Sequence, residues 1–305
     1  MFRVIALTVC SICLGGCRSS APMHVWQPPR LETAVGKKVV LSSVTGPEEV
    51  TAPLKQLLLS SAPSDRGRAT SLIAAESLPK PETIRLVSAF DDEPNDLVLA
   101  SLSRQSGADY LWRGEVIGYD QPSLPSSTLR LSWGLISLSD GGKSAGMPIV
   151  VDHEKVLERY PDLAFVQPAE RQLLAGAARD SLQLIAPWID RQATQLSRPY
   201  LMPGSREVRR GNLSAQAGNW GEAEAIWESV WQRYPTQIAA LHNLALAAAA
   251  GQDFSRARKL ARRTVRLSPT ALHKNTMVWI ELMQRDYHDA FGLPDPPEGW
   301  FISRR

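Results

Sequence analysis

The 305-residue sequence predicts an α+β protein, in which an N-terminal α/β domain with a mixed sheet precedes a long helix and all-α helical hairpins. Three observations indicate this class. Strand-like and helix-like runs alternate over residues 36–165, a helical pattern with a linker occupies 166–203, and a 34-residue period runs through 204–291. The remaining segments are expected to be a leader (1–17), a tether (18–35) and a tail (292–305).

All three cysteines lie in the first seventeen residues, at Cys10, Cys13 and Cys17. Arg3 precedes an apolar run, Val4–Leu14, which is shorter than the about 20 residues needed to span a bilayer. This arrangement predicts a secretory signal peptide, which is removed from the mature protein. Cys10 and Cys13 would leave with it, so neither a metal site nor a disulfide is expected there.

The leader ends in Leu14-Gly15-Gly16-Cys17, which resembles the lipobox of bacterial lipoproteins. The resemblance implies that Cys17 receives lipid, including palmitate, and that the acyl chains anchor the protein in the cell envelope. Arg18 stands where lipoproteins kept at the inner membrane usually carry aspartate, which implies the outer membrane and a periplasmic orientation. An ordinary signal peptide with a chance cysteine is the alternative. The segment 18–35, rich in Ser and Pro, is interpreted as a tether.

The α/β domain is predicted from short runs with strand or helix periodicity. A strand, KKVVLSSV, begins at Lys37, and Pro47 is placed at the start of a helix with the sequence EEVTAPLKQLLLSS. Further elements are expected as a strand at 84–90, a helix from Asn95 to Gln105 that stops before Gly107, and strands at 108–119, 127–139 and 146–154.

The strand expected at 127–139 has a change of phase. Leu129, Leu131 and Trp133 alternate with polar residues, but after Gly134 the apolar positions slip to Ile136 and Leu138. A slip at a glycine predicts a β-bulge or bend. The Asp-Gly pair at 140–141 predicts a hairpin turn before the next strand.

A family resemblance covers about residues 36–155. The stretch Gly107–Val116, GADYLWRGEV, followed by a strand pair with an Asp-Gly-Gly turn, resembles the periplasmic α/β domain of curli-secretion-type and penicillin-binding-protein-activator-type lipoproteins. The matching positions are structural. The resemblance therefore implies a fold and supplies no catalytic residue.

A helix is expected over 168–192, with Pro168 at its start and Pro187 ending or kinking it. The segment 197–206, SRPYLMPGSR, has two prolines and a glycine and is expected to be a linker or hinge.

Beyond the linker, equivalent residues recur 34 positions apart: Gly211 and Ala245, Trp220 and Phe254, Ala223 and Ala257, and Pro235 and Pro269. Small residues where helices approach, an aromatic opening the second helix and a closing proline resemble the tetratricopeptide (TPR) repeat. The segment 272–291 resembles a first helix without its partner and is expected to close the stack. Since about three repeats are usually needed for stability, the hairpins are expected to pack against the helix at 170–196.

Three of the nine tryptophans, Trp220, Trp227 and Trp231, share one helical face. The repeat pattern explains Trp220 and Trp227 as core residues. Trp231 lies outside that pattern and is left as a candidate for exposure.

Several short motifs suggest chemistry but lack the required context. The sequence GGKS at 141–144 has Ser137 where a P-loop needs glycine, so nucleotide binding is not expected. Asp152-His153-Glu154 lacks a second ligand cluster, and Asp91-Asp92-Glu93 is one acidic loop rather than the separated pair of a glycosidase. A net charge of +3 with dispersed basic residues disfavours nucleic acid. No catalytic residue, metal or cofactor is predicted.

The sequence therefore predicts a non-enzymatic lipoprotein that binds a protein or peptide partner through its repeats, as an adaptor or scaffold. Polar residues on the first helices of the repeats are the candidate contacts, although a plain solvated face is the favoured explanation for each one taken singly: Arg209, Asn212, Gln216, His242 and Asn243. The alternatives are an oligomeric subunit of an envelope secretion or assembly apparatus and, less favoured, a cell-wall or glycan enzyme. Oligomeric state is left open.

Overall fold

The computed structural model describes residues 19–31, 35–63, 70–78, 96–120, 127–139 and 144–302, and it has the mixed α/β class that the sequence predicts. The chain forms two compact units. One, here called the sheet unit, comprises Gln27–Trp188 and His288–Pro294. The other, here called the repeat unit, comprises Met1–Trp26, Ile189–Tyr287 and Asp295–Arg305.

The sheet unit contains a five-stranded sheet in the order β3-β2-β4-β5-β6. Its strands are β2 (Lys38–Thr45), β3 (Ser71–Ala74), β4 (Tyr110–Tyr119), β5 (Thr128–Ser137) and β6 (Ser144–Asp152). β2 is parallel to both of its neighbours, whereas β4, β5 and β6 form an antiparallel meander. The sheet is therefore mixed, as predicted.

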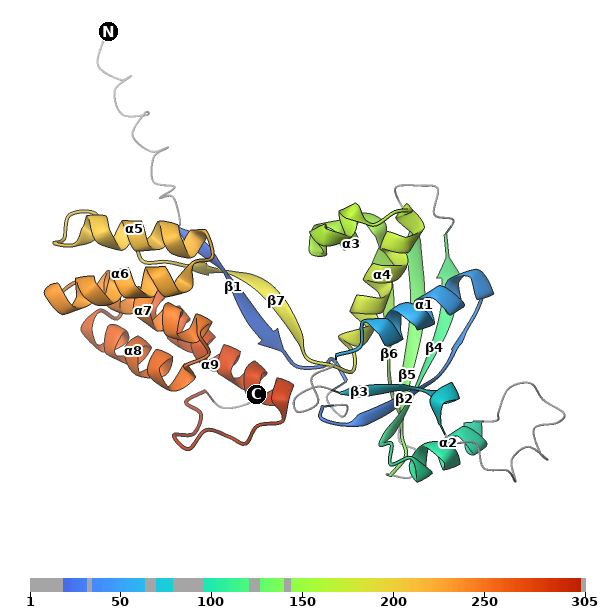
Figure 1. The fold of residues 1–305 in the computed structure, drawn as a ribbon. Helices are drawn as coiled ribbons and strands as arrows, with labels where there is room; N and C mark the ends of the chain where they lie inside the picture. Colours follow the sequence, from blue (N-terminus) through green and yellow to red (C-terminus); the bar gives the residue numbers. More distant parts are fainter. Residues whose placement is uncertain are drawn as a thin grey trace, which may run out of the picture. The chain divides into compact units, whose positions relative to one another are not determined.

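Helices cover both faces of this sheet (Figure 1). α1 (Glu48–Ser60) and α4 (Ala169–Leu182) pack on the face that carries the larger core, and α2 (Asp96–Gln105) packs on the other. The shorter helices are α3 (His153–Arg159), the 3-10 turn η2 (Ala75–Ser77) and the 3-10 turn η5 (Pro161–Phe165).

The larger core is built around two stacked indoles. Trp112 of β4 and Trp133 of β5 lie with ring centroids 4.2 Å apart, and both are fully buried. Gly114 is the cross-strand partner of Trp133, and a Cβ at Gly114 would lie 2.6 Å from the indole ring. The glycine is therefore required because the large ring crosses directly over its backbone.

The predicted bulge at Gly134 is wrong. The pairing of β5 with both neighbours continues through Gly134, and the register shift lies in β4, between Val116 and Gly118. The apolar positions shift because this end of β5 is covered on both faces. Leu135 still faces the larger core, while Ile136 on the opposite face packs into the cluster around α2. A strand covered on both faces loses its apolar alternation without any change in geometry. The strand expected at 84–90 and the turn at 140–143 lie outside the described residues.

The tether and the long helix also need correction. Residues Ser20–Gln27 form strand β1, which pairs with β7 (Trp188–Gln195) in a two-stranded sheet. β1 buries every second residue, which is the period of a strand. The expected long helix is shorter than predicted, since α4 ends at Leu182, before Pro187. Composition rich in Ser and Pro concealed that alternation, because the buried positions carry Ala21, Met23 and Val25.

The repeat unit consists of antiparallel helices beside the two-stranded sheet of β1 and β7, here called the ribbon (Figure 1). α5 (Ser205–Gln216) packs with α6 (Trp220–Arg233), α7 (Ile238–Ala250) packs with α8 (Phe254–Leu267), and α9 (Ala271–Phe291) follows. The helix expected at 170–196 ends at Leu182, and Trp188–Gln195 form β7 instead. The core of the hairpins includes β1 residues and Leu196, so the β1–β7 ribbon packs against the hairpins.

Candidate functional site

The predicted contact residues lie on the inner face of the helical hairpins, but most of them are not accessible. Asn212 is 3% exposed, His242 is 1% exposed and Asn243 is completely buried. Arg209 is partly buried, and Gln216 is exposed at the end of α5. The structure brings the three buried residues together and places the other two at separate positions along α5.

The three buried residues surround the backbone of Ser197, which follows β7. The Asn243 Oδ1 accepts a hydrogen bond from the Ser197 amide at 2.8 Å, and its Nδ2 donates to the Ser197 carbonyl at 3.0 Å. The Nδ2 of Asn212 donates to the same carbonyl at 3.1 Å, and its Oδ1 accepts from Asn243 at 2.8 Å. One asparagine side chain therefore binds both the main-chain amide and the main-chain carbonyl of a single residue, Ser197.

His242 completes this arrangement, which we call the amide clamp (Asn212, His242 and Asn243). Its Nδ1 lies 3.0 Å from the Asn243 Oδ1, which only accepts, so the ring proton belongs on Nδ1. The Nε2 then accepts from the Thr276 hydroxyl at 3.0 Å. Burial lowers the pKa of His242 to about 4, and the nearby His273 ring, 5.0 Å away, acts in the same direction. His242 is therefore neutral near pH 7.

Two further contacts hold the ends of the covering segments. Arg209 Nη1 donates to the Pro199 carbonyl at 3.2 Å, and Gln216 Nε2 donates to the Ser19 hydroxyl at 3.3 Å. All five predicted residues thus contact the chain itself. We expected these side chains to line an open groove along the first helices, and this is wrong because the segment that follows β7 in the same unit, Ser197–Pro199, lies in that groove. Sequence spacing cannot reveal such an occupant, since Ser197 and Asn243 are 46 positions apart.

A second polar cluster, missed by sequence reasoning, holds the C-terminal segment. Glu281 on α9 is 3% exposed, and its Oε1 accepts from the amides of Phe301 and Ile302, both at 2.7 Å, and from Arg285 Nη2 at 3.2 Å. Arg258 on α8 donates to the Gly299 carbonyl at 2.7 Å. One signal was available: Arg258 lies four residues after Phe254, on the buried stripe of its helix.

The three tryptophans of α6 are core or packing residues. Trp227 is completely buried, and its indole N–H donates to the Val208 carbonyl at 3.1 Å. Trp220 is partly buried and donates to the Pro22 carbonyl in β1 at 2.9 Å. Trp231 is also partly buried, and the Arg263 guanidinium lies over its ring at 5.0 Å. None of them forms an open aromatic site.

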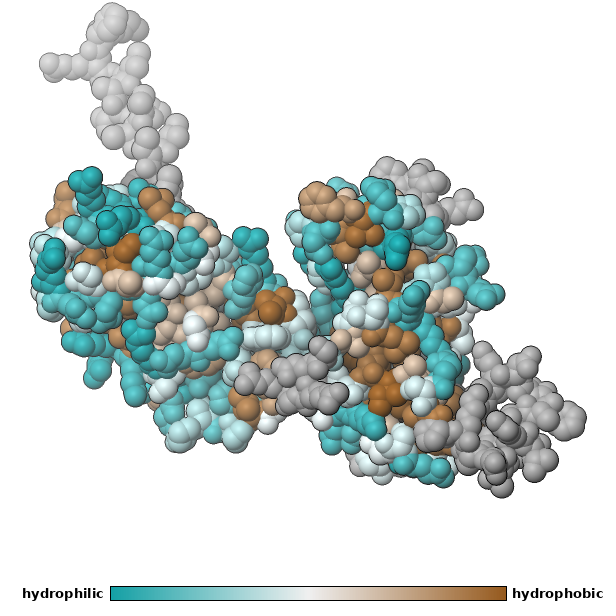
Figure 2. All heavy atoms as spheres, in the orientation of Figure 1, coloured by the Kyte–Doolittle hydropathy of each residue, from teal (hydrophilic) through white to brown (hydrophobic). Residues whose placement is uncertain are grey.

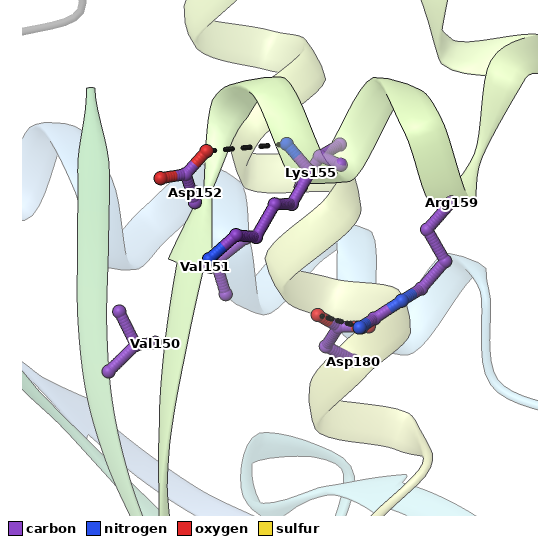
Figure 3. Close-up of a pocket in the computed structure, with 7 residues that line it drawn as sticks. Val150, Val151, Asp152, Lys155, Arg159 and Asp180 are labelled. Carbon is purple, nitrogen blue, oxygen red and sulfur yellow. Dashed lines mark hydrogen bonds and ion pairs between the residues drawn. The ribbon is translucent and has the colours of Figure 1, made fainter. Parts of the chain in front are cut away.

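The sheet unit has a shallow recess beside β6 and α3 (Figure 3), lined by Val150, Val151, Asp152, Lys155, Val156, Arg159 and Asp180. Asp152 caps α3 by accepting from the amides of Glu154 and Lys155, at 3.1 and 3.3 Å. Arg159 Nη1 contacts both carboxylate oxygens of Asp180, at 2.9 and 3.0 Å. The charged groups here stabilise a helix end and a helix pair.

The same element explains the Asp152-His153-Glu154 motif. His153 Nε2 lies 2.8 Å from the Gln172 Oε1 on α4, so its ring packs toward a helix rather than toward the two neighbouring carboxylates. Among the described residues, no three His, Cys, Asp or Glu side chains converge as ligands for a metal ion. The acidic run at 91–93 and the predicted lipidation site Cys17 lie outside the described residues. No described helix is long and apolar enough to cross a membrane.

Comparisons with known proteins add little to this geometry. No family model and no curated protein matches the chain. Two solved structures of PelC dodecamers from Paraburkholderia phytofirmans are similar to part of it, each with 12% identity over 54% of this chain. They are covered over 94% and 97% of their own lengths, with TM-scores of 0.29 and 0.27. TM-scores this low establish neither a shared fold nor a shared function.

Proposed function

We propose that this chain is a non-enzymatic, lipid-anchored envelope protein that binds a protein or peptide partner through its helical hairpins. Lipid on Cys17 holds it at the outer membrane, facing the periplasm, and the hairpins belong to the tetratricopeptide class. The amide clamp is the observation that supports binding, because it holds one extended residue through main-chain atoms. Recognition through the main chain accepts any sequence that presents a free amide and carbonyl in that geometry.

The chain's own segment defines what a partner must offer. Leu196 is 2% exposed and packs into the core of the hairpins, and burying a leucine contributes about 1.5–3 kcal/mol. The next residue, Ser197, supplies an amide, so proline is excluded at that position. The partner segment therefore carries an apolar residue followed by any residue other than proline. When it binds, it displaces Leu196–Pro199 and takes the place of that segment.

Opposite effects of two substitutions test this exchange. Ser197→Pro removes the amide that Asn243 binds and loosens the resident segment, so partner capture should rise; Ser197→Ala keeps the amide and should change nothing. Asn243→Ala removes the clamp and should lower capture, whereas Asn219→Ala, an exposed asparagine in the turn before α6, is the matched control. Capture is measured in cells with a photo-cross-linker at the exposed Arg198, and each variant's folding is checked by circular dichroism.

If Asn243→Ala and Asn219→Ala capture the same partners in equal amounts, the groove is not the binding site. Palmitate labelling tests the anchor separately: it should be lost in Cys17→Ser, and labelling that persists would contradict the proposal.

One observation favours the alternative of an oligomeric assembly subunit. β6 lies at an edge of the described sheet, and Val150 on its solvent side is 65% exposed. Edge strands are templates for pairing between chains, although Pro148 removes one amide from this edge. Size-exclusion chromatography separates the two functions, since a stable ring-sized oligomer would favour the assembly subunit over the adaptor.

A further inference from the structure

Ser19, where the described part of the repeat unit begins, is held by hydrogen bonds to two other segments of that unit. The Ser19 carbonyl accepts from the Leu196 amide at 2.8 Å, and the Ser19 hydroxyl accepts from Gln216 at the end of α5 at 3.3 Å. Strand β1 begins at the next residue, beside α5 (Figure 1). Cys17 is two residues before Ser19, and two residues span at most about 7 Å. A lipid on Cys17 would therefore bring the end of α5 to the membrane surface.

α5 is the first helix of the stack among the described residues of the repeat unit. Its buried stripe contains Val208, Gly211 and Ala215, which face α6 and the ribbon. Its opposite side carries Arg206, Arg210 and Leu213, spaced four and three residues apart and therefore on one face. Leu213 is 66% exposed and lies about one helical turn after Arg210.

An exposed apolar loop directly precedes the same helix. Tyr200, Leu201 and Met202 are consecutive and are 63%, 98% and 47% exposed. Arg198 lies over the Tyr200 ring at 5.6 Å. Aromatic and aliphatic side chains beside arginines are the composition of segments that lie in the headgroup region of a membrane. Figure 2 shows hydrophobic patches set among hydrophilic residues along the edge of the repeat unit formed by α5.

We propose that this surface, here called the basic face (Tyr200, Leu201, Met202, Arg206, Arg210 and Leu213), rests on the membrane that holds the lipid anchor. The loop residues enter the headgroup region, and the two arginines pair with lipid phosphates. α5, about 18 Å long, lies along the surface between its two attachments, the loop at its start and the lipidated terminus at its end. The inference rests on the proposed lipidation of Cys17, and it sets the orientation of the repeat unit on the membrane.

Photo-cross-linking of the full-length lipoprotein tests the orientation. Benzoylphenylalanine at Leu201 or Leu213 should form phospholipid adducts, detected by mass, in vesicles of phosphatidylcholine and phosphatidylglycerol. The matched control is Leu267 at the end of α8, which is 53% exposed and lies outside the basic face. A yield at Leu201 at least tenfold above that at Leu267 supports the proposal. Equal yields would overturn it, and so would protein adducts in place of lipid adducts in intact cells.

The charge of the vesicle separates phosphate pairing from simple proximity to lipid. Adduct yield at Leu201 should be severalfold higher with phosphatidylglycerol than with phosphatidylcholine alone, since each arginine near an anionic surface strengthens binding about fivefold. Arg206→Gln together with Arg210→Gln should abolish this difference, whereas Arg233→Gln on α6 should keep it. If the double variant keeps the difference in adduct yield between vesicles with and without phosphatidylglycerol, the proposed role of the two arginines is contradicted.

Failure of the anchor and failure of the orientation give different results. If palmitate labelling depends on Cys17 but Leu201 forms no lipid adduct, the anchor stands and the orientation is wrong. If labelling persists in Cys17→Ser, the anchor is wrong, and the two-residue separation of Cys17 from Ser19 no longer places the end of α5 at the membrane.

Discussion

The core of the sheet unit is built around the stacked indoles of Trp112 and Trp133, whereas buried polar and charged side chains in the repeat unit hold its non-helical segments against the helices. The amide clamp holds Ser197 on one side of the stack, and Glu281 holds Phe301 and Ile302 on another. A short stack of hairpins has exposed ends, because stacking covers each hairpin only where it has a neighbour. In this protein the segment after the ribbon and the C-terminal segment cover part of that exposed surface, while the outer face of α5 stays exposed, and directional hydrogen bonds keep both segments in place.

The largest effect should come from removing an indole from the sheet unit. Trp133→Ala should cost about 3–5 kcal/mol in unfolding free energy, because it leaves a large cavity beside Trp112. Hydrogen exchange in β4 and β5 should rise, and the loss should be the same at pH 7 and pH 5, since no titrating group is involved. A strong pH dependence would contradict the picture of an apolar core.

A slightly smaller loss should follow from Glu281→Ala in the repeat unit. The substitution removes the acceptor of two amides and leaves the 7% exposed Arg285 without its carboxylate, at a cost of about 3 kcal/mol. Urea unfolding gives the magnitude, and hydrogen exchange should locate the loss in α8 and α9. Glu222→Ala, an exposed glutamate in the first turn of α6, should change stability by less than about 0.5 kcal/mol. A cost below about 1 kcal/mol for Glu281→Ala would show that the C-terminal segment is not held by this carboxylate.

Acid should destabilise the repeat unit through His242. Its folded pKa of about 4 lies below the usual value of 6.5, so the unfolded chain binds a proton that the folded chain resists. The contribution of His242 to the unfolding free energy is fully present above pH 6.5. It falls as the pH drops toward 4, by at most about 3 kcal/mol. The His242→Gln variant should be less stable than the unsubstituted protein at pH 7, but its unfolding free energy should decrease less between pH 7 and pH 4. Parallel stability profiles for the two proteins between pH 7 and pH 4 would exclude His242 as the titrating group.

The smallest effect concerns the approach of α5 to α6. A Cβ at Gly211 would lie 2.5 Å from the Trp227 Nε1, so Gly211→Ala should cost about 1–2 kcal/mol despite the better helix propensity of alanine. A Cβ at Gly221 on α6 would meet no atom within 4 Å, and Gly221→Ala should be neutral or stabilising by up to about 1 kcal/mol. Thermal unfolding of the two variants tests this pair, and equal shifts would argue against a close helix contact at Gly211.

Local periodicity was sufficient to find most helices and strands, but it did not find their partners. The alternation in β5 and the 34-residue echo between Trp220 and Phe254 are local properties, and the corresponding strand and helices are present. β1 was interpreted as a tether because its buried positions have small or flexible side chains, and β3 was missed because it has only four residues. The predicted contact residues were placed on the first helices of the repeats, but three of them are buried, and two of these three bind Ser197, in a segment that no repeat pattern includes.

The sequence by itself determined the mixed α/β class, the C-terminal helical region and the need for a small residue at Gly211, since each follows from the spacing of neighbouring residues. Only the tertiary structure decided that β1 pairs with β7, that Ser197 occupies the groove and that Glu281 binds the C-terminal segment. These contacts join residues that are far apart in the chain. Asparagine or glutamate on a helix can equally face water or a buried amide, and the choice depends on which segment arrives to cover it.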